Sequence, residues 1–316
     1  MEITEQDGLT VATVSRDEAE DGAWRARAAE LDLVRLGEPG TEDAVLHRLG
    51  FTARPKWVNW VAPLGGSPDE WLASLGGTER RNVRLAHRFV AAEGMRLEVH
   101  QGLTERQLDA FLPVYDEQIA GMPRGRNFAR KHRDRLLEGA DGLLSVFVHA
   151  DGGADSPLVA GSLWQWRPAE SVLQLRFSAA AADARSGRVM RAAYAAAFDR
   201  ARAGGLGYAS LGNDPSLFGH VVQPGLFTFK SRLGFRALPS EVLNPELAGE
   251  FQDRFLSLRA LADPSLVVAW GELRGRAPGW PAAADGPSPD LLVLTGDGRA
   301  QGLPSTGFRR TRVLAL

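Results

Sequence analysis

The sequence contains no cysteine, and this absence removes several kinds of chemistry at once. Disulfides, thiolate nucleophiles, covalent thioester intermediates and zinc sites that use sulfur are all excluded. The histidines show no HExxH or similar ligand spacing, so we expect no metal site. They are His47, His87, His100, His132, His149 and His220. Any group transfer by this chain must therefore be direct or pass through oxygen.

Long apolar runs are also lacking. No run approaches the ~18 residues that a membrane-spanning helix needs. The beginning of the chain is acidic and polar, where a signal peptide would be basic and then apolar. We therefore expect no membrane span and a cytoplasmic location. The net charge of −2 argues against a surface built entirely for nucleic acid, although local basic patches are compatible with it.

Lysine is scarce as well. Arginine is the default cation of this chain, so each lysine becomes more informative; the lysines are Lys56, Lys131 and Lys230. The apolar share of 44% and the charged share of 24% are those of an ordinary globular protein. A length of 316 residues suits one large domain or two of ordinary size, and we expect two lobes. The sequence indicates nothing about the oligomeric state.

Hydrophobic periodicity and turn residues predict the elements of the first half of the chain. A capping box of Thr104 and Gln107 opens one of its helices, and Thr78 is the expected N-cap of another. The predicted strands are 9–14, 57–63 and 96–100. The predicted helices are 17–36, 68–75, one that begins after Thr78, 104–120 and a basic helix over 127–139.

The second half predicts three strands in an antiparallel meander, followed by a helix and a further strand. Because the connection through the helix is a crossover, the third strand and the last one should be parallel. The ranges are 143–149, 158–166, 171–178, the helix 186–203 and the strand 208–211. A loop, a helical turn over 226–233 and a strand over 235–238 come next. We expect a helix from Asn244, a strand over 266–270 and a terminal hairpin of 291–295 with 310–316.

This order of elements resembles the core of the GNAT acyltransferase superfamily, in which two parallel strands splay apart around the acyl donor. The segment Leu211-Gly212-Asn213-Asp214, followed by Gly225-Leu226-Phe227-Thr228-Phe229-Lys230 and Gly234-Phe235, resembles the end of the catalytic lobe in the Fem peptidoglycan ligases and Fem-like acyltransferases. The arginine-rich stretch that follows Trp71-Leu72 also resembles the corresponding segment of these ligases. These likenesses cover about 57–238.

The resemblance implies a fold class and a division of the chain. We expect an α/β (α+β) fold with a GNAT-like mixed sheet, splayed parallel strands and two GNAT-like lobes. The expected domains are a first lobe over 1–100, a catalytic core over 101–240 and a C-terminal extension over 241–316 that packs back on the first lobe.

The sequence departs from coenzyme A-binding GNAT proteins at the pyrophosphate loop. The loop glycine corresponds to Gly187, but Ala184 and Val189 stand where the family pattern has an arginine or glutamine and a glycine or alanine. The Fem ligases use aminoacyl-tRNA and also lack this loop. Acyl-CoA and aminoacyl-tRNA therefore both stay open as the co-substrate, with no tightly bound cofactor.

Candidate catalytic residues follow from the chemistry of acyl transfer to an amine. A fixed cation at the tetrahedral oxyanion can lower the barrier by about 3 kcal/mol. Lys230 is the candidate, since the matching lysine of the Fem ligases is implicated in this role; the alternative is a solvated lysine on a surface turn. Asp214 and His220 are candidate bases for the acceptor amine. The candidate substrate-binding and donor-binding residues are Arg80, Arg81, Arg84, Arg88, Arg176, Arg185, Arg188 and Phe229.

Two groups of basic residues stand out in the sequence. The first patch lies in the opening turns of one helix, where positive charge opposes the helix dipole unless an anion binds there. It comprises Arg80, Arg81, Arg84 and Arg88. The second patch could meet a tRNA acceptor stem; it comprises Arg124, Arg126, Arg130, Lys131, Arg133 and Arg135. The sequence thus predicts an N-acyltransferase acting on a small-molecule or peptide amine, with tRNA as a further partner. The alternative is a catalytically silent GNAT-like lobe that serves as a binding module.

Overall fold

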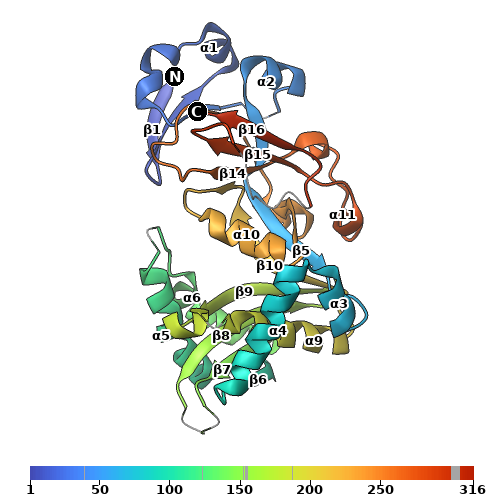
Figure 1. Cartoon of the computed structure of the whole chain (residues 1–316). Coiled ribbons are helices and arrows are strands. Elements are labelled where there is room, and N and C mark those ends of the chain that lie inside the picture. The colour runs from blue at the N-terminus through green and yellow to red at the C-terminus, as the bar shows by residue number, and fades with distance from the viewer. Residues whose placement is uncertain (39, 123, 152, 154–155, 187, 300–306) are drawn as a thin grey trace. The chain divides into compact units, whose positions relative to one another are not determined.

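The computed structural model describes residues 1–38, 40–122, 124–151, 153, 156–186, 188–299 and 307–316. Its described part is a mixed α/β structure with one sheet of five strands, one of seven and one of four (Figure 1). The predicted α/β class is therefore confirmed. The chain forms two compact units: unit 1 holds 1–60, 213–231 and 235–316, and unit 2 holds 61–212 and 232–234.

The five-stranded sheet of unit 1 combines strands from both ends of the chain. Its order is β1 (Glu2–Gln6), β2 (Leu9–Val14), β3 (Leu33–Leu36), β13 (Glu250–Phe255) and β4 (Thr52–Pro55). Strand β13 pairs antiparallel with β3 on one side and with β4 on the other. A strand from late in the chain therefore completes the sheet that the N-terminal residues begin.

The four-stranded sheet of unit 1 corrects the expected terminal hairpin. Its order is β11 (Leu217–Phe218), β14 (Ser265–Ala269), β15 (Asp290–Thr295) and β16 (Thr311–Ala315). Strands β15 and β16 pair in parallel, so the hairpin prediction was wrong. Antiparallel neighbours can be joined by a tight turn, whereas parallel neighbours cannot, so the two strands do not form a hairpin.

Two predicted helices of unit 1 are also wrong. Gly22, at φ 70°, ends a short helix in the left-handed conformation, so the helix expected over 17–36 becomes α1, a 3₁₀ turn and β3. The helix expected from Asn244 is the strand β13, because apolar residues four apart fit a strand as well as a helix. The helices of this unit are α1 (Arg16–Asp21), η1 (Arg25–Glu30), α2 (Asp43–Leu49), α10 (Pro224–Arg232), η3 (Ser240–Val242), η4 (Pro245–Leu247), η5 (Gly271–Leu273) and α11 (Ala282–Asp285).

The seven-stranded sheet confirms the predicted meander and crossover. Its order is β12 (Arg236–Pro239), β5 (Trp57–Pro63), β10 (Tyr208–Pro215), β9 (Val172–Ala180), β8 (Leu158–Arg167), β7 (Leu143–His149) and β6 (Arg96–Gln101). Strands β7, β8 and β9 pair antiparallel, and β10 is parallel to β9. Strands β5 and β10 each run from one unit into the other.

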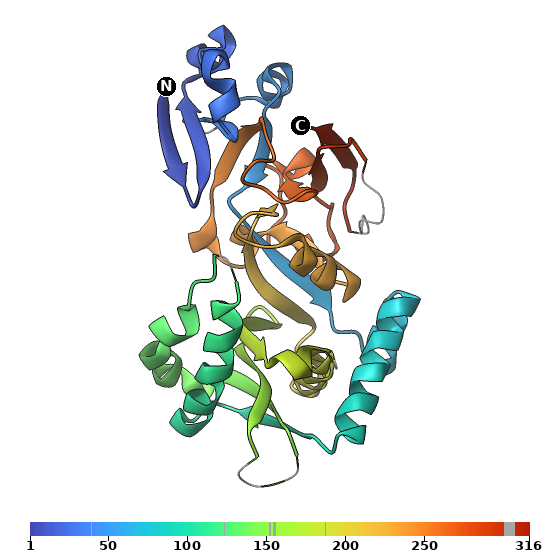
Figure 2. The same cartoon turned by 60° about the vertical axis from the view of Figure 1, so that its left-hand side comes forward.

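Helices cover both faces of the meander in unit 2. Figure 2 shows helices packed around the strands of this unit. Leu163 of β8 packs in the core beneath α5, whereas the next residue, Trp164, contacts Tyr194 and Phe198 of α9. Neighbouring residues of a strand point to opposite faces. The helices are α3 (Pro68–Ser74), α4 (Gly77–Ala92), α5 (Glu105–Ala120), α6 (Phe128–Lys131), α7 (Arg133–Glu138), η2 (Ala140–Gly142), α8 (Ala182–Ser186) and α9 (Val189–Ala203).

The predicted helix starts of unit 2 have mixed outcomes. The capping box of Thr104 and Gln107 is present at α5. Helix α4 begins two residues earlier than expected, with Gly76 and not Thr78 as its N-cap. The basic helix expected over 127–139 is two short helices separated at His132.

Candidate active site

The parallel strands β9 and β10 part after a short ladder. They pair from Tyr208 with Val172 to Ser210 with Gln174, whereas the strands continue to Ala180 and Pro215. Gly212 follows the last paired residues with φ 78°, and a Cβ there would lie 2.9 Å from the carbonyl oxygen of Leu175. Only glycine suits this conformation and this approach. The splayed parallel strands predicted from the sequence are therefore present.

A β-bulge marks strand β9 near the same point. The pairing with β8 steps from Leu163 with Phe177 to Trp164 with Leu175, which leaves Arg176 as the extra residue. The Arg176 side chain is exposed, and its Nη1 donates to Oε1 of Gln165 at 3.3 Å.

Lys230 and Asp214 form a buried ion pair within unit 1. The Nζ atom of Lys230, on α10, donates to Oδ2 of Asp214, near the end of β10, at 2.7 Å. The exposed fractions of the two side chains are 6% and 10%. The alternative of a solvated surface lysine is therefore wrong. The structure brings together two of the residues that the sequence singled out, from positions 16 residues apart.

Aromatic packing fixes the helix that carries Lys230. Phe227 is fully buried, and its ring centre lies 5.3 Å from those of Trp60 and Phe218. It also stacks on Phe308 at 5.5 Å. Phe229, the residue proposed from the sequence, is only half-buried, so Phe227 is the main anchor of α10.

An amide network that the sequence reasoning missed surrounds the residue before Asp214. Oδ1 of Asn213 accepts from Nδ2 of Asn59 and from the hydroxyl of Ser240, both at 2.8 Å. Nδ2 of Asn213 donates to Oδ1 of Asn244 at 3.3 Å. These bonds hold the end of β10 in place. The one sequence signal for this network was Asn213 itself, within the Leu-Gly-Asn-Asp segment. Its hydrogen-bond partners come from distant parts of the chain, so the network could not be predicted from that segment.

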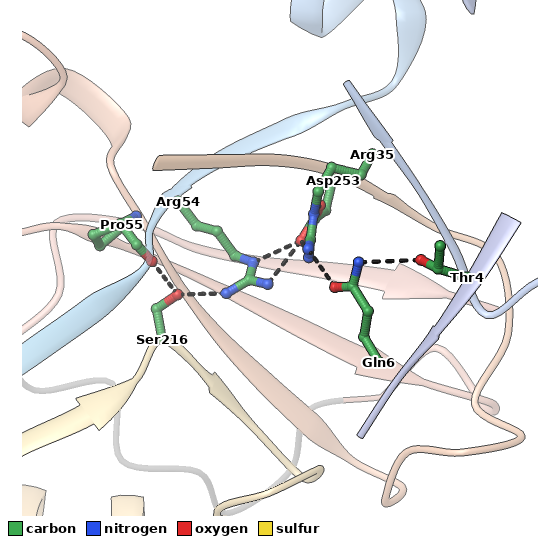
Figure 3. A network of polar contacts seen from close by, with 7 residues as sticks. All are labelled: Thr4, Gln6, Arg35, Arg54, Pro55, Ser216 and Asp253. Atoms are coloured by element: carbon green, nitrogen blue, oxygen red, sulfur yellow. Dashed lines mark hydrogen bonds and ion pairs between the residues drawn. The ribbon is translucent and has the colours of Figure 1, made fainter. Parts of the chain in front are cut away.

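A second buried network lies two residues beyond Asp214 (Figure 3). Arg54 of β4 donates Nε and Nη2 to Oδ2 of Asp253, at 2.9 and 2.8 Å, and Nη1 to the hydroxyl of Ser216 at 2.8 Å. Ser216 in turn donates to the carbonyl of Pro55, and Arg35 donates Nε to Asp253 at 2.7 Å. The network ties the N-terminal sheet to the chain segment that follows Asp214.

The Asp253 network makes stability depend on pH. Burial disfavours the charged carboxylate, but Arg54 and Arg35 outweigh it and hold the pKa of Asp253 below its usual value. A depressed pKa adds stability above the unfolded value, 3.8, and this stability is lost as pH falls through the folded value. We expect the Tm advantage of the native chain over an Arg54→Met, Asp253→Leu variant to shrink between pH 5 and pH 3, as followed by circular dichroism; an unchanged difference contradicts this.

His220, the other candidate base, is buried in unit 1. Its Nδ1 lies 3.3 Å from the carbonyl oxygen of Ala260. A carbonyl only accepts, so this contact assigns the proton to Nδ1 and leaves Nε2 as the basic nitrogen.

The arginines of α4 do not act as one group. Arg80 donates to the carbonyls of Leu72, Ala73 and Leu75 at 2.9–3.0 Å, and so closes the C-terminal end of α3. The other three are exposed and lie three and four residues apart, on one face of the helix. Within the described part of the chain their side chains form no ion pair or hydrogen bond; they are Arg81, Arg84 and Arg88.

The remaining candidate arginines lie around the segment that corresponds to the pyrophosphate loop, and on α6 and α7. Arg185 donates to the carbonyl of Ala180 at 2.7 Å, and Arg188 has a left-handed backbone with φ 60°. Gly187 lies outside the described residues. Both Ala184 and Val189 are buried, so these positions face the core.

The second basic patch is partly neutralised. Arg130 donates Nε to Oδ2 of Asp116 at 3.0 Å, and Arg133 pairs with Glu105 and Asp109 at 2.7 and 2.9 Å. The Arg130 guanidinium holds the pKa of Asp116 below its usual value. Arg130 and Arg133, two members of the predicted second patch, therefore already have carboxylate partners.

The described residues include neither a grouped set of metal ligands nor a membrane-spanning helix. Among them, no three or more His, Cys, Asp or Glu side chains are grouped so as to hold a metal ion. In the same part of the chain no helix combines the length and the apolar character that crossing a membrane requires.

Comparison with known proteins found similarity at the level of structure. No protein-family model matches the chain, and no curated protein matches it. The structure of FemX is similar over 78% of this chain and 80% of that one, with 15% identity and a TM-score of 0.47. L-PGS from Bacillus licheniformis covers 81% and 80%, with 14% identity and a TM-score of 0.42. A tandem GNAT protein from the clavulanic acid biosynthesis pathway covers 77% and 68%, with 11% identity and a TM-score of 0.35. These neighbours include the Fem and GNAT proteins that the sequence resembles.

Proposed function

We propose that the chain is an N-acyltransferase that moves an acyl or aminoacyl group from an activated donor onto an amine by direct attack. The observation that carries the proposal is the buried Lys230–Asp214 pair, held at 2.7 Å, in which Asp214 follows Gly212 of β10 by two residues. A buried charge pair costs desolvation energy and contributes little to stability compared with apolar side chains. A functional role accounts for its presence. The proposed setting is the cytoplasm, and the acceptor is a small-molecule or peptide amine.

Lys230 is proposed to stabilise the oxyanion. The amine nitrogen attacks the carbonyl carbon, and the electron pair of the C=O bond moves onto its oxygen. The ammonium of Lys230 carries three N–H donors, and Asp214 accepts one of them. When the oxyanion collapses, the bond to the donor's sulfur or oxygen breaks. The amine proton passes to His220, the proposed base, and then to the leaving group.

Asp214 is proposed as a positioning residue and not as the base. Oδ2 of Asp214 is already engaged by the ammonium of Lys230 at 2.7 Å, and the carboxylate is buried. Its position at the end of β10, between the Asn213 and Ser216 networks, fixes where Nζ of Lys230 lies. This revises the role that the sequence suggested for Asp214.

The donor is proposed to be acyl-CoA or aminoacyl-tRNA, and the exposed face of α4 offers the test. We call Arg81, Arg84 and Arg88 the α4 arginines. Their charges have no carboxylate partner in the described part of the chain, so they suit the phosphates of either donor. A tRNA engages many phosphates, whereas coenzyme A presents few.

A salt titration separates the two donors. If tRNA is the donor, log Kd for total tRNA should change steeply with log salt, and replacing the α4 arginines by glutamine should reduce the slope by about 0.7–0.9 per lost contact. The matched control replaces Arg16, Arg27 and Arg48, each already paired with a glutamate, and should leave the slope unchanged. If the Kd for coenzyme A depends only weakly on salt, and tRNA shows no salt-sensitive binding, the thioester donor is favoured. An unchanged slope in the α4 variant contradicts the phosphate role of this face.

A further inference from the structure

A pocket of unit 1 lies between α2, the start of β4 and the last strand, β16. It has a volume of about 220 Å³. Three buried apolar side chains contribute to its wall: Leu46, Phe51 and Trp270. Arg310, directly before β16, and Arg312, within it, also line the pocket, and residues two apart on a strand share one face. We call Arg310 and Arg312 the β16 arginines.

The two carboxylates in the pocket wall each have an arginine partner. Oδ1 of Asp43 accepts from Nη1 of Arg274 at 2.7 Å. Both carboxylate oxygens of Asp290 accept from Arg309, at 3.0 Å each. The negative groups of this pocket are therefore already engaged by cations other than the β16 arginines.

The β16 arginines have no such partners. Within the described part of the chain neither side chain forms an ion pair or a hydrogen bond. The residues 300–306, which lie outside that part, include no aspartate or glutamate.

Two buried donors of the same wall also lack acceptors. They are Nε of Arg312 and the indole Nε1 of Trp270, neither of which has a hydrogen-bond partner among the described residues. Buried donors are normally paired, and leaving one unpaired is costly. An oxyanion bound beside these side chains supplies acceptor oxygens that the described residues do not.

The charge and the size of the pocket define the class of ligand. A phosphate monoester carries a charge of about −1.5 to −2 at pH 7 and three strong acceptor oxygens, which match two guanidinium groups, whereas a carboxylate brings one charge and two oxygens. Guanidinium groups bind phosphate oxygens with paired, charge-assisted hydrogen bonds. The volume is below the ~300 Å³ at which pockets for drug-sized ligands begin, so the group attached to the phosphate is a single ring or a short chain.

We propose that this pocket binds a small phosphate monoester, with its oxygens held by the β16 arginines and its body against Phe51 and Trp270. The site shares no residue with the Lys230–Asp214 pair or with the α4 arginines. It is therefore a ligand site in addition to the proposed acyl transfer, and its occupancy does not depend on that reaction.

Calorimetric titration of the full chain with phenyl phosphate, at about 0.15 M salt, tests the proposal. The native protein should bind one phenyl phosphate, and Arg310→Gln and Arg312→Gln should each weaken binding about tenfold or more, because each removes a charge-assisted contact. Arg276→Gln is the matched control. It removes the same charge from another exposed position of unit 1 that does not line the pocket, and should change Kd by less than about twofold.

Three outcomes overturn the inference. They are no saturable binding of phenyl phosphate, unchanged binding in both variants of the β16 arginines, and an equal loss of binding in the Arg276 control. Arg310 is exposed, so Arg310→Gln should keep the native melting curve. If Arg312→Gln, at a half-buried position, melts at a lower temperature, the Arg310 variant alone decides the outcome.

Two further ligands test the parts of the assignment. Inorganic phosphate lacks the apolar body and should bind about tenfold more weakly than phenyl phosphate. Phosphate that binds as tightly overturns the role of Phe51 and Trp270 and identifies the ligand as the free ion. Phenyl sulfate has the same shape with a single negative charge and should also bind more weakly; equal affinity overturns the match of two charges to the β16 arginines.

Discussion

Replacing Lys230 by methionine should lower the rate of acyl transfer by about 10²–10³-fold, the usual effect of removing one oxyanion donor. The same change should lower the free energy of unfolding by about 3 kcal/mol or more, because it leaves the buried carboxylate of Asp214 without its cation. The structure therefore changes an expectation that the sequence alone would support, namely that a functional lysine can be removed at no cost to stability. Turnover and urea unfolding of the same samples measure both effects.

A double variant separates the two effects. In Lys230→Met, Asp214→Leu both charges are replaced by apolar groups of similar size, and most of the lost stability should return. Turnover should stay low, because no cation faces the oxyanion. If the double variant transfers acyl groups at the native rate, Lys230 has no catalytic role and the pair is structural.

A chain that ends at residue 240 should fail to fold its first unit. Strand β13 lies between β3 and β4, and Asp253 at its centre is fully buried with Arg54 and Arg35. Deletion removes this strand and three further strands of unit 1, which leaves apolar edges open and two arginines without their carboxylate. The loss should exceed the whole stability of a typical domain, about 5–15 kcal/mol.

A milder truncation provides the control. A chain that ends at residue 299 lacks β16, an edge strand whose side chains are mostly exposed, and the stacking of Phe308 on Phe227. It should keep a cooperative thermal transition, whereas the chain ending at 240 should lose that of unit 1. A cooperatively melting 1–240 chain contradicts the account and favours a C-terminal extension that is independent of the first lobe. The boundary proposed from the sequence at 240 is tested by the same two chains.

Local patterns predicted the parts of the fold that depend on neighbouring residues. The capping box of Thr104, the meander of β7, β8 and β9, and the crossover to β10 each follow from periodicity and turns within a few tens of residues. The sequence singled out Lys230 and Asp214 because a single motif contains both, but it did not predict that they form an ion pair.

Contacts that hydrophobic periodicity does not encode account for several of the errors. The apolar spacing of β13 fits a helix equally well, and only its partners β3 and β4, about 200 residues earlier, decide that it is a strand. Arg80 belongs to a cluster of arginines in the sequence, yet its guanidinium donates to a backbone carbonyl of α3. The amide network of Asn213 likewise depends on Asn59 and Asn244, whose proximity no local pattern encodes.

Acyl transfer itself can be measured directly, and the absence of cysteine from the chain makes the measurement clean. A thiol reagent reports free coenzyme A without any signal from the protein, and mass spectrometry of the intact chain shows whether an acyl group is ever attached to it. Panels of acyl-CoA and aminoacyl-tRNA donors are combined with amine acceptors, and products are identified by mass. Direct attack predicts an acylated amine that forms only when donor and acceptor are both present, with the mass of the protein unchanged and with little product from Lys230→Met. An acyl adduct on the protein that precedes product, or no acylated amine from any donor in either panel, contradicts the proposed function.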